Sequence, residues 1–514
     1  MLRIMIIGIL ISSMWNPTCA DPPNIVIFLV DDMGWQDTSV PFGPEETAFN
    51  RRYRTPNMER LAERGMLFTD AYSASPVCTP TRTSIMTGQS PGRTGISYWT
   101  LHPDRDNSTK HPRIAAPPWK KEGLQDEDLT LADILQEAGY FTIHVGKAHL
   151  GAVGTSGADP ENLGFDLNIA GHGPGGPGSF YGTHDFKARK RQGKTGPSVW
   201  DVPGLESHHG KDVYLTEVLS REAIKAIDLA DRNQQPFFLH FAPYAVHAPI
   251  MANHRYLANY RSLDKREAAY ATMIETMDDA LGEILDELDQ RNITDDTIVI
   301  FTSDNGGLSA HARGGTPHVH NAPLRSGKGS AYEGGVRVPL IIAWPGVVPG
   351  GTRNSTPVIS MDLFPTIIEM AETDTPEGTE RHEDGWNLAP ILRGIAEGDA
   401  ERRLTWHMPH QWGASGPGIE PFSSIRRGPW KLYYFHDGPR IELYDLSEDP
   451  GETSEISATN LEISRALLTD LDAWFRETGA DMSIDRSSNQ PVMMPGTASR
   501  SIHDMTHKVG GVRQ

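Results

Sequence analysis

The sequence predicts an α/β protein: a large, mostly parallel β-sheet sandwiched by helices, followed by a smaller C-terminal α+β subdomain. Two observations predict the large sheet. Short apolar runs recur along the chain, and helical patterns lie between them. A third observation, a hairpin pattern after about residue 400, predicts an antiparallel sheet in the subdomain.

Four apolar runs, rich in β-branched and aromatic residues, are expected to be strands that are buried on both faces. They occupy residues 24–30, 140–145, 236–241 and 297–302. Strands of this kind belong in a parallel sheet that is covered by helices on both sides.

Three segments between these runs have helical spacing. Residues 130–138 begin with Thr130 and Asp133, which suit a helix N-terminal cap, and end at Gly139. Residues 213–230 and 266–289 carry apolar side chains at the helical period. Helices that alternate with strands predict parallel strand pairing.

The C-terminal part has a different pattern. Residues 430–435 and 440–444 flank His436-Asp-Gly-Pro439, which is typical of a β-hairpin, and residues 460–477 have helical spacing. We therefore predict a signal peptide (1–20), a catalytic domain (21–400), an α+β subdomain (401–490) and a weakly structured tail (491–514).

Composition excludes several classes of protein. The 514 residues are 38% hydrophobic and 22% charged, as in ordinary soluble globular proteins. The net charge of −20 argues against nonspecific binding to nucleic acid or anionic membranes. An anionic substrate still fits if cations gather in one cleft.

The first 20 residues resemble an export signal. Arg3 gives a basic start, a short apolar run follows, and Thr18-Cys-Ala20 is a suitable cleavage site. The run is too short to span a bilayer, and no later segment is long and apolar enough. We expect a periplasmic or secreted protein without a transmembrane segment.

Polar side chains follow all four predicted strands. Because ligands bind beyond the carboxyl ends of strands in such sheets, we expect these side chains to form one site. They are Asp31, Asp32, Lys147, His149, His247, Asp304 and Asn305.

The acidic and amide groups among them suit a metal ion. Asp31, Asp32, Asp304 and Asn305 offer only oxygen ligands, which hard cations prefer. Either pair alone is typical of a loop or a helix cap, but two pairs at equivalent strand ends favour a cation site. We predict Ca²⁺, with Mg²⁺ as the alternative.

Cys78 is the one cysteine that remains once the signal peptide, which contains Cys19, is removed. An exported protein with one cysteine cannot form an internal disulfide. The neighbours Thr79, Thr81 and Arg82 are polar, so a buried apolar role fits less well than a reactive one.

Three segments resemble the type I, formylglycine-dependent sulfatases of the alkaline-phosphatase-like superfamily. Pro76-Val-Cys-Thr-Pro-Thr-Arg82 is similar to the family's Cys-x-Pro-x-Arg motif, although Ser or Ala is more common where this chain has Thr81. Residues 139–149 resemble the second sulfatase motif, and residues 325–339 resemble the segment with the second active-site lysine. The resemblance spans roughly residues 22–450.

The resemblance implies that a formylglycine-generating enzyme oxidises Cys78, which joins Asp31, Asp32, Asp304 and Asn305 at the metal. The hydrated aldehyde then attacks sulfur, with Asp304 accepting its proton and Arg82 orienting it. The remaining roles implied are sulfuryl binding by Lys147 and Lys328, leaving-oxygen protonation by His247 with Lys328, and sulfate expulsion by His149 as base.

Substrate specificity is expected from loops around the pocket. The loop candidates are His172, His311, Arg313, His318, His320 and Arg325, and the C-terminal ones are Trp406, His407, His410 and Trp412. Aromatic and cationic side chains suit a sulfated polysaccharide or oligosaccharide.

Three other functions are compatible with the same motifs. They are an arylsulfatase of broad specificity, a phosphate or phosphonate monoester hydrolase that uses the same modification, and an inactive protein that binds sulfated glycans. The last is disfavoured because this chain retains every catalytic and metal position.

Overall fold

Strand β1 (Asn24–Val30) lies inside the main sheet, and its side chains contribute to two separate cores. Val26 and Phe28 enter the core on one face, whereas Ile25 and Ile27 enter the core on the other. The apolar run in the sequence therefore has its physical cause in burial on both faces, as predicted.

The structure is a computed structural model that describes residues 22–188, 197–376 and 383–499. The predicted signal peptide lies outside these residues. The main sheet has eight strands in the order β10-β2-β9-β8-β1-β7-β5-β6. Besides β1 these are β2 (Met66–Phe68), β5 (Phe141–Gly146), β6 (Leu167–Ile169), β7 (Phe237–Ala242), β8 (Thr297–Ser303), β9 (Leu340–Ala343) and β10 (Thr352–Asn354).

Most pairings in this sheet are parallel. Strand β1 runs parallel to β7 and β8, and β5 runs parallel to β7 and β6. Only β9 is antiparallel to its neighbours β8 and β2. The strands β1, β5, β7 and β8 therefore end at one edge of the sheet, where the predicted site residues follow them.

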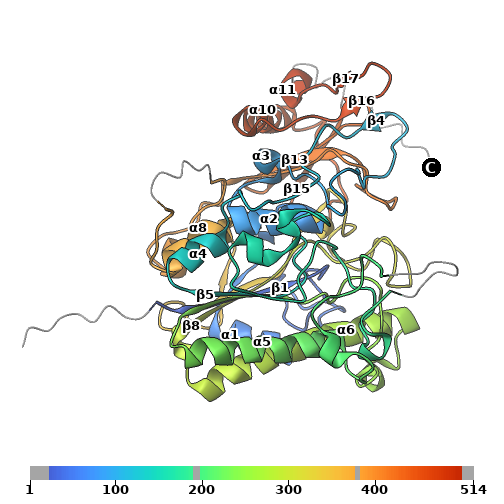
Figure 1. Cartoon of the computed structure of the whole chain (residues 1–514). Coiled ribbons are helices and arrows are strands. Elements are labelled where there is room, and N and C mark those ends of the chain that lie inside the picture. The colour runs from blue at the N-terminus through green and yellow to red at the C-terminus, as the bar shows by residue number, and fades with distance from the viewer. Residues whose placement is uncertain (1–21, 189–196, 377–382, 500–514) are drawn as a thin grey trace, which may run out of the picture.

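Helices cover both faces of the sheet (Figure 1). One layer consists of α1 (Pro56–Arg64), α5 (Leu215–Arg232) and α6 (Lys265–Arg291), and the other of α2 (Cys78–Thr87), α4 (Leu131–Glu137) and α8 (Leu363–Met370). The predicted cap of α4 is present: Thr130 and Asp133 form a reciprocal capping box. The predicted α/β class is confirmed.

The C-terminal part is built on a four-stranded antiparallel sheet, as predicted. It contains β12 (Arg403–Met408), β13 (Phe422–Arg427), β14 (Trp430–Phe435) and β15 (Arg440–Asp445), and α10 (Leu461–Thr478) covers one face. Tyr433 and Phe435 point to the opposite face, where they pack with Tyr332 of the first part. The two parts thus share a core.

Short elements complete the described chain. The strands are β3 (Ala71–Tyr72), β4 (Ile114–Ala115), β11 (Val358–Ile359), β16 (Ile484–Asp485) and β17 (Gln490–Pro491); the helices are α3 (Pro91–Thr94), α7 (Glu333–Val336), α9 (Ala389–Leu392) and α11 (Pro495–Ala498). Single 3₁₀ turns occupy Ser156–Ala158, Pro160–Leu163, Gly182–His184, Glu206–His208, Leu257–Tyr260, Thr294–Asp296 and Ser360–Asp362.

The described start of the predicted tail contains one short helix, α11, and residues 500–514 lie outside the described residues. Helix α11 packs on α10, where Ala498 is buried and Asp472 accepts a hydrogen bond from the backbone of Gly496 at 2.9 Å. Sparse apolar residues hid this element, because one buried turn needs only one or two of them. Among the described residues, no helix combines the length and apolar character that a membrane crossing requires.

Gly146 is the last residue of β5 and directly precedes Lys147. Its surroundings show how closely the backbones of β5 and β7 approach at this edge of the sheet. Its φ is +100°, and a Cβ there would lie 2.1 Å from the carbonyl oxygen of Ala242. Gly139, before the same strand, has a φ of +92° but no atom within 4 Å of such a Cβ.

We expect Gly146→Ala to destabilise the protein far more than Gly139→Ala, because the first adds a backbone clash to the left-handed strain. The control should cost about 1 kcal/mol, the strain alone. Urea unfolding monitored by circular dichroism measures both variants. Equal losses of unfolding free energy would contradict the close approach of β5 and β7.

Candidate functional site

The strand ends at this edge bring the predicted residues together. Asp31 and Asp32 follow β1, Asp304 and Asn305 follow β8, and Lys147 follows β5. All five side chains are buried. The prediction that these strand ends form one polar site agrees with their positions in the structure.

Cys78 is the first residue of α2 and lies against this group. Its Sγ is 3.7 Å from Asp31 Oδ1 and 3.2 Å from Lys328 Nζ. Burial, reinforced by the charge of Asp304, raises the pKa of the Cys78 thiol to about 12. As an unmodified thiol, Cys78 is protonated at neutral pH and is therefore a poor nucleophile.

Two buried lysines neutralise the carboxylates. Lys147 Nζ lies 2.6 Å from Asp31 Oδ1, and Lys328 Nζ lies 2.5 Å from Asp32 Oδ1. Burial raises the pKa of Asp31, helped by repulsion from Asp304 and Asp32. For Asp32, burial acts in the same direction, but Lys328 and His247 outweigh it and the pKa is lowered.

Arg82 completes the charge network from α2. Its Nε donates to Asp304 Oδ2 at 2.8 Å, and its Nη1 donates to the carbonyl of Lys147 at 2.7 Å. Burial opposes the charge of Asp304, but Arg82 and Lys147 hold the pKa of this carboxyl below its usual range. Asp304 is therefore ionised at neutral pH.

The arrangement fits a divalent cation. Asp31, Asp32, Cys78 and His247 each offer a ligand atom, and these atoms lie within 4.8 Å of one another. The buried Asp31 Oδ2, Asp32 Oδ2 and Asn305 Oδ1 have no hydrogen-bond partner. Carboxylate and amide oxygens that converge without donors are a ligand set for a hard cation.

Each of the two predicted catalytic histidines has one ring nitrogen fixed by a carbonyl. His149 Nε2 lies 2.9 Å from Thr100 O, and His247 Nδ1 lies 2.6 Å from Ala248 O. Because a carbonyl oxygen only accepts, these nitrogens carry the protons, which leaves His149 Nδ1 and His247 Nε2 as acceptors in the neutral rings. Burial, helped by Lys328, lowers the pKa of His247 to about 3, and burial with Lys147 lowers that of His149.

A cavity of about 320 Å³ opens above Cys78. Lys328, His149 and His247 reach it from the charged side. Its other walls are largely aromatic and are formed by Tyr98, Trp99, Trp200, His311 and Trp412, with Asn107 beside them. Lys147 is fully buried below Asp31 and does not line the cavity.

Of the loop residues predicted to bind substrate, only His311 lines this cavity, where its ring lies 5.6 Å from that of Trp412. His172 packs edge-on against Tyr244, and His318 lies against Gly416. These two histidines are near the site but outside the cavity walls.

Three residues that were predicted to bind substrate form contacts with other parts of the protein. Arg313 is fully buried and pairs with Asp37 and Glu267. His320 donates to the carbonyl of Gly314, and Arg325 points toward the C-terminal sheet. Their positions give no support to a role in binding substrate, because each side chain is already occupied by protein partners. Loop position alone could not distinguish these from cavity residues.

Among the C-terminal candidates, Trp412 lines the cavity and packs on Gly329, where a Cβ would lie 2.2 Å from its ring. Trp406, His407 and His410 are buried in the protein core. Sequence reasoning missed Trp99, Trp200 and Asn107. They come from segments far apart in the chain and match no motif. Tryptophans in otherwise polar loops could nevertheless have indicated a ligand-binding surface.

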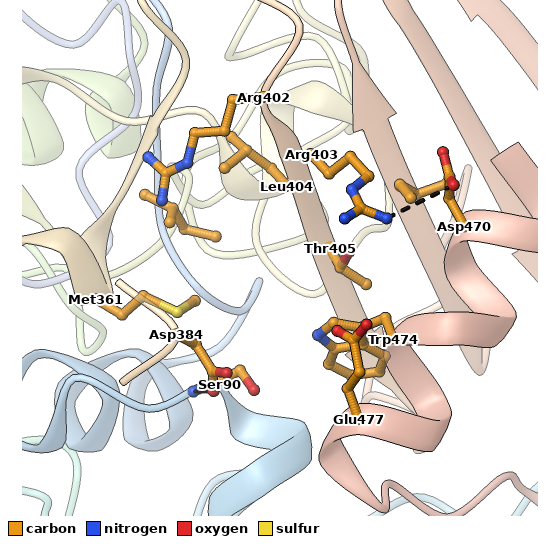
Figure 2. A pocket seen from close by; sticks show the side chains of 12 residues that line it. Ser90, Met361, Asp384, Arg402, Arg403, Leu404, Thr405, Asp470, Trp474 and Glu477 are labelled. Atoms are coloured by element: carbon orange, nitrogen blue, oxygen red, sulfur yellow. Dashed lines mark hydrogen bonds and ion pairs between the residues drawn. The ribbon is translucent and has the colours of Figure 1, made fainter. Parts of the chain in front are cut away.

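A second cavity, of about 160 Å³, lies between α3, β12 and α10 (Figure 2). Its polar groups include Asp384, Arg402 and the ion pair of Arg403 with Asp470 at 3.6 Å. None of the predicted catalytic or metal residues lines it. The cavity above Cys78 is therefore the candidate active site.

Two family models match the chain. The model described as "Sulfatase" matches residues 23–373, and "N-sulphoglucosamine sulphohydrolase, C-terminal" matches residues 327–474. N-acetylgalactosamine-6-sulfatase of Homo sapiens is 31% identical over 87% of this chain and 84% of its own length. A "Sulfatase" of Formosa agariphila is 28% identical over 96% of this chain and 97% of its own length.

Two solved structures are also similar to this chain. The structure of "Ps i-CgsB in complex with k-i-k-neocarrahexaose" superposes with a TM-score of 0.71 at 26% identity, covering 96% of this chain and 100% of that one. The phosphonate monoester hydrolase of Agrobacterium radiobacter has a TM-score of 0.57 at 20% identity, covering 87% and 95%, and shows the shared fold alone.

We expect a divalent cation to raise the melting temperature, because its ligands are assembled in the folded protein and not in the unfolded chain. Ca²⁺ at 100 times its dissociation constant should add about 2.7 kcal/mol. Asp31→Asn should weaken this effect, whereas Asp278→Asn, which changes another buried carboxyl, should not. A melting temperature that is equal in Ca²⁺ and in a chelator would contradict the metal site.

Proposed function

This chain belongs to the sulfatase family and is a sulfuric ester hydrolase, and we propose that it removes sulfate from a sulfated polysaccharide or oligosaccharide. The observation that carries the proposal is the position of Cys78. It lies in the family motif, at the floor of an aromatic cavity, between Lys328 and the carboxylate cluster. The ammonium of Lys328, 3.2 Å from the Cys78 Sγ, suits an anionic ester group at this position.

The nucleophile is a formylglycine made from Cys78. In the described structure, the Cys78 Sγ stands where the oxygens of the hydrated aldehyde would be. A hydrated aldehyde has two hydroxyls on one carbon, so one attacks sulfur and the other, once deprotonated, expels sulfate. A serine in this position would remain sulfated, because it lacks the second hydroxyl.

Asp31, Asp32, Asp304 and Asn305 would hold the proposed Ca²⁺ ion. When bound, the cation would favour the deprotonated form of the nucleophile. Lys328 lines the cavity and binds the non-bridging oxygens of the ester directly. Lys147 supports them from below Asp31, and Arg82 holds Asp304 in place to accept the proton.

Two histidines handle the remaining protons. The Nδ1 of His149 is buried without a hydrogen-bond partner, and His149 lines the same cavity as Cys78, so His149 is assigned to accept the proton of the second hydroxyl. His247 lies on the cavity wall and is assigned, with Lys328, to protonate the departing oxygen; its Nε2 must first take up a proton, which the charge of Asp32, 3.7 Å away, favours. Although burial opposes it, pairing with Asp32 raises the pKa of Lys328, so the lysine stays protonated and cationic at neutral pH.

The aromatic walls support a carbohydrate substrate. Trp99, Trp200 and Trp412 offer flat apolar surfaces that suit the apolar faces of sugar rings. The similar human protein is named for an N-acetylgalactosamine 6-sulfate substrate, and the similar solved structure contains a neocarrahexaose. Export through the N-terminal segment would place the enzyme in the periplasm or outside the cell, where such polymers occur.

We expect Cys78→Ala to abolish sulfate release, with a loss above about 10³-fold, because no nucleophile remains. Mass spectrometry of the wild-type peptide should show an aldehyde in place of the thiol. The control, Ser84→Ala, changes a buried residue of the same helix and should stay active. Undiminished hydrolysis by the alanine variant would refute the proposed nucleophile.

We expect Trp99→Ala and Trp200→Ala to raise KM for a sulfated oligosaccharide about tenfold each, equivalent to about 1.4 kcal/mol of lost binding. KM for a small aryl sulfate should change little. Trp386→Ala removes a 44% exposed tryptophan outside the cavity and serves as the control. Release of sulfate from aryl sulfates but from no sulfated glycan would favour an arylsulfatase, and faster turnover of a matched phosphate ester would favour a phosphohydrolase.

A further inference from the structure

Lys328 lies on a segment, residues 325–333, that contains no strand and no full helix. On the side of the main sheet, backbone hydrogen bonds hold it: Lys328 N donates to Gly307 O at 3.0 Å, and Gly329 N donates to Pro76 O at 2.9 Å. These bonds fix the backbone beside Lys328 but leave the rest of the segment without support from regular structure.

The C-terminal part supplies that support, and Arg325 is its first contact. Its Nη1 donates to Tyr444 Oη at 3.1 Å and to Glu452 O at 2.9 Å. The guanidinium also stacks over the Tyr332 ring, 3.9 Å from its centroid. Arg325 therefore ties both ends of the segment to β15 and the loop that follows it.

Further contacts with the C-terminal part follow along the segment. Ser330 Oγ donates to Pro417 O at 2.8 Å, and Ala331 N donates to Gly418 O at 2.9 Å. Tyr332 Oη then donates to Glu442 Oε2 at 2.7 Å. Three consecutive residues beyond Gly329 are thus bonded to the C-terminal part.

A buried charge cluster closes the segment at Glu333. Lys431 of β14 pairs with Glu333 Oε1 at 2.5 Å, and both side chains are fully buried. The backbone N–H of Glu333 donates to Glu452 Oε2 at 2.9 Å. Because an unpaired buried charge is costly, this cluster opposes movement of the C-terminal sheet away from the segment.

We propose that the C-terminal sheet positions Lys328 for catalysis and that Arg325 is the positioning residue of this device. The inference rests on the proposed role of Lys328 at the ester. Lys328 must hold its ammonium near both Asp32 and the nucleophile, and displacement by about 1 Å can cost about 10²-fold in rate. Arg325 touches no reacting atom and acts through the segment alone.

The decisive variant is Arg325→Met, compared with Arg402→Met. Arg402 also lies at the junction of the two parts, where it is buried, pairs with Asp362 at 2.5 Å and stacks on Trp386 at 4.2 Å, but it lies beside the second cavity (Figure 2). Both variants lose an arginine at the same junction, and only one loses a contact to the Lys328 segment.

We expect Arg325→Met to lower kcat about 10- to 100-fold with little change in KM. If Lys328 is displaced, kcat should fall more for aryl sulfates whose phenol is weakly acidic than for those whose phenol is strongly acidic. The oxygen of a weakly acidic phenol depends more on protonation when it leaves. Arg325→Lys should restore part of the rate, and Arg402→Met should show no dependence on the leaving group. Thermal melts identify any variant that fails to fold. If Arg325→Met does not fold, Tyr444→Phe is used in its place, because it removes one acceptor of Arg325.

The crystal structure of the Arg325 variant gives a readout that does not depend on activity. The inference predicts that Lys328 Nζ moves from its position 2.5 Å from Asp32 Oδ1. An unmoved lysine, or a loss of rate equal to that of Arg402→Met across all leaving groups, would overturn it. Inactivity of the correctly matured wild type would instead refute the proposed function.

Discussion

The site depends on one constraint: three carboxyl groups that are buried from water must each be held beside a matching cationic side chain. Asp31, Asp32 and Asp304 are all fully buried, and each is matched by Lys147, Lys328 or Arg82. A buried charge without a partner would shift its pKa or destabilise the fold. The cations that balance the carboxylates are also those that an incoming anionic ester requires.

This balance explains why the catalytic groups come from so many elements. The carboxylates follow β1 and β8, Lys147 follows β5, and Arg82 lies on α2, so the parallel sheet brings them to one edge. Lys328 is the exception, because its segment follows no strand directly. The fold compensates by covering this segment with the antiparallel sheet, whose Tyr433 and Phe435 extend the core across the boundary.

Sequence patterns predicted the helices and strands whose residues follow a regular hydrophobic pattern or a capping motif, such as β1 and α4. They also located the residues from Asp31 to Asn305, because strand ends in a parallel sheet converge by topology. They could not show that Arg313 and Arg325 pair with other protein groups, since an arginine with partners and a free one in a loop look alike in sequence. Trp99 and Trp200 meet only through tertiary packing, which no local pattern records.

The most direct test of the account is a crystal structure of the Cys78→Ala variant, which cannot attack the ester, with a sulfated oligosaccharide. We predict that the ester sulfur lies beside the side chain of residue 78, that Lys328 Nζ contacts a sulfuryl oxygen at about 3 Å, and that the sugar ring rests against the tryptophans of the cavity. An oligosaccharide bound away from this cavity, with no sulfate near Lys328, would contradict the account.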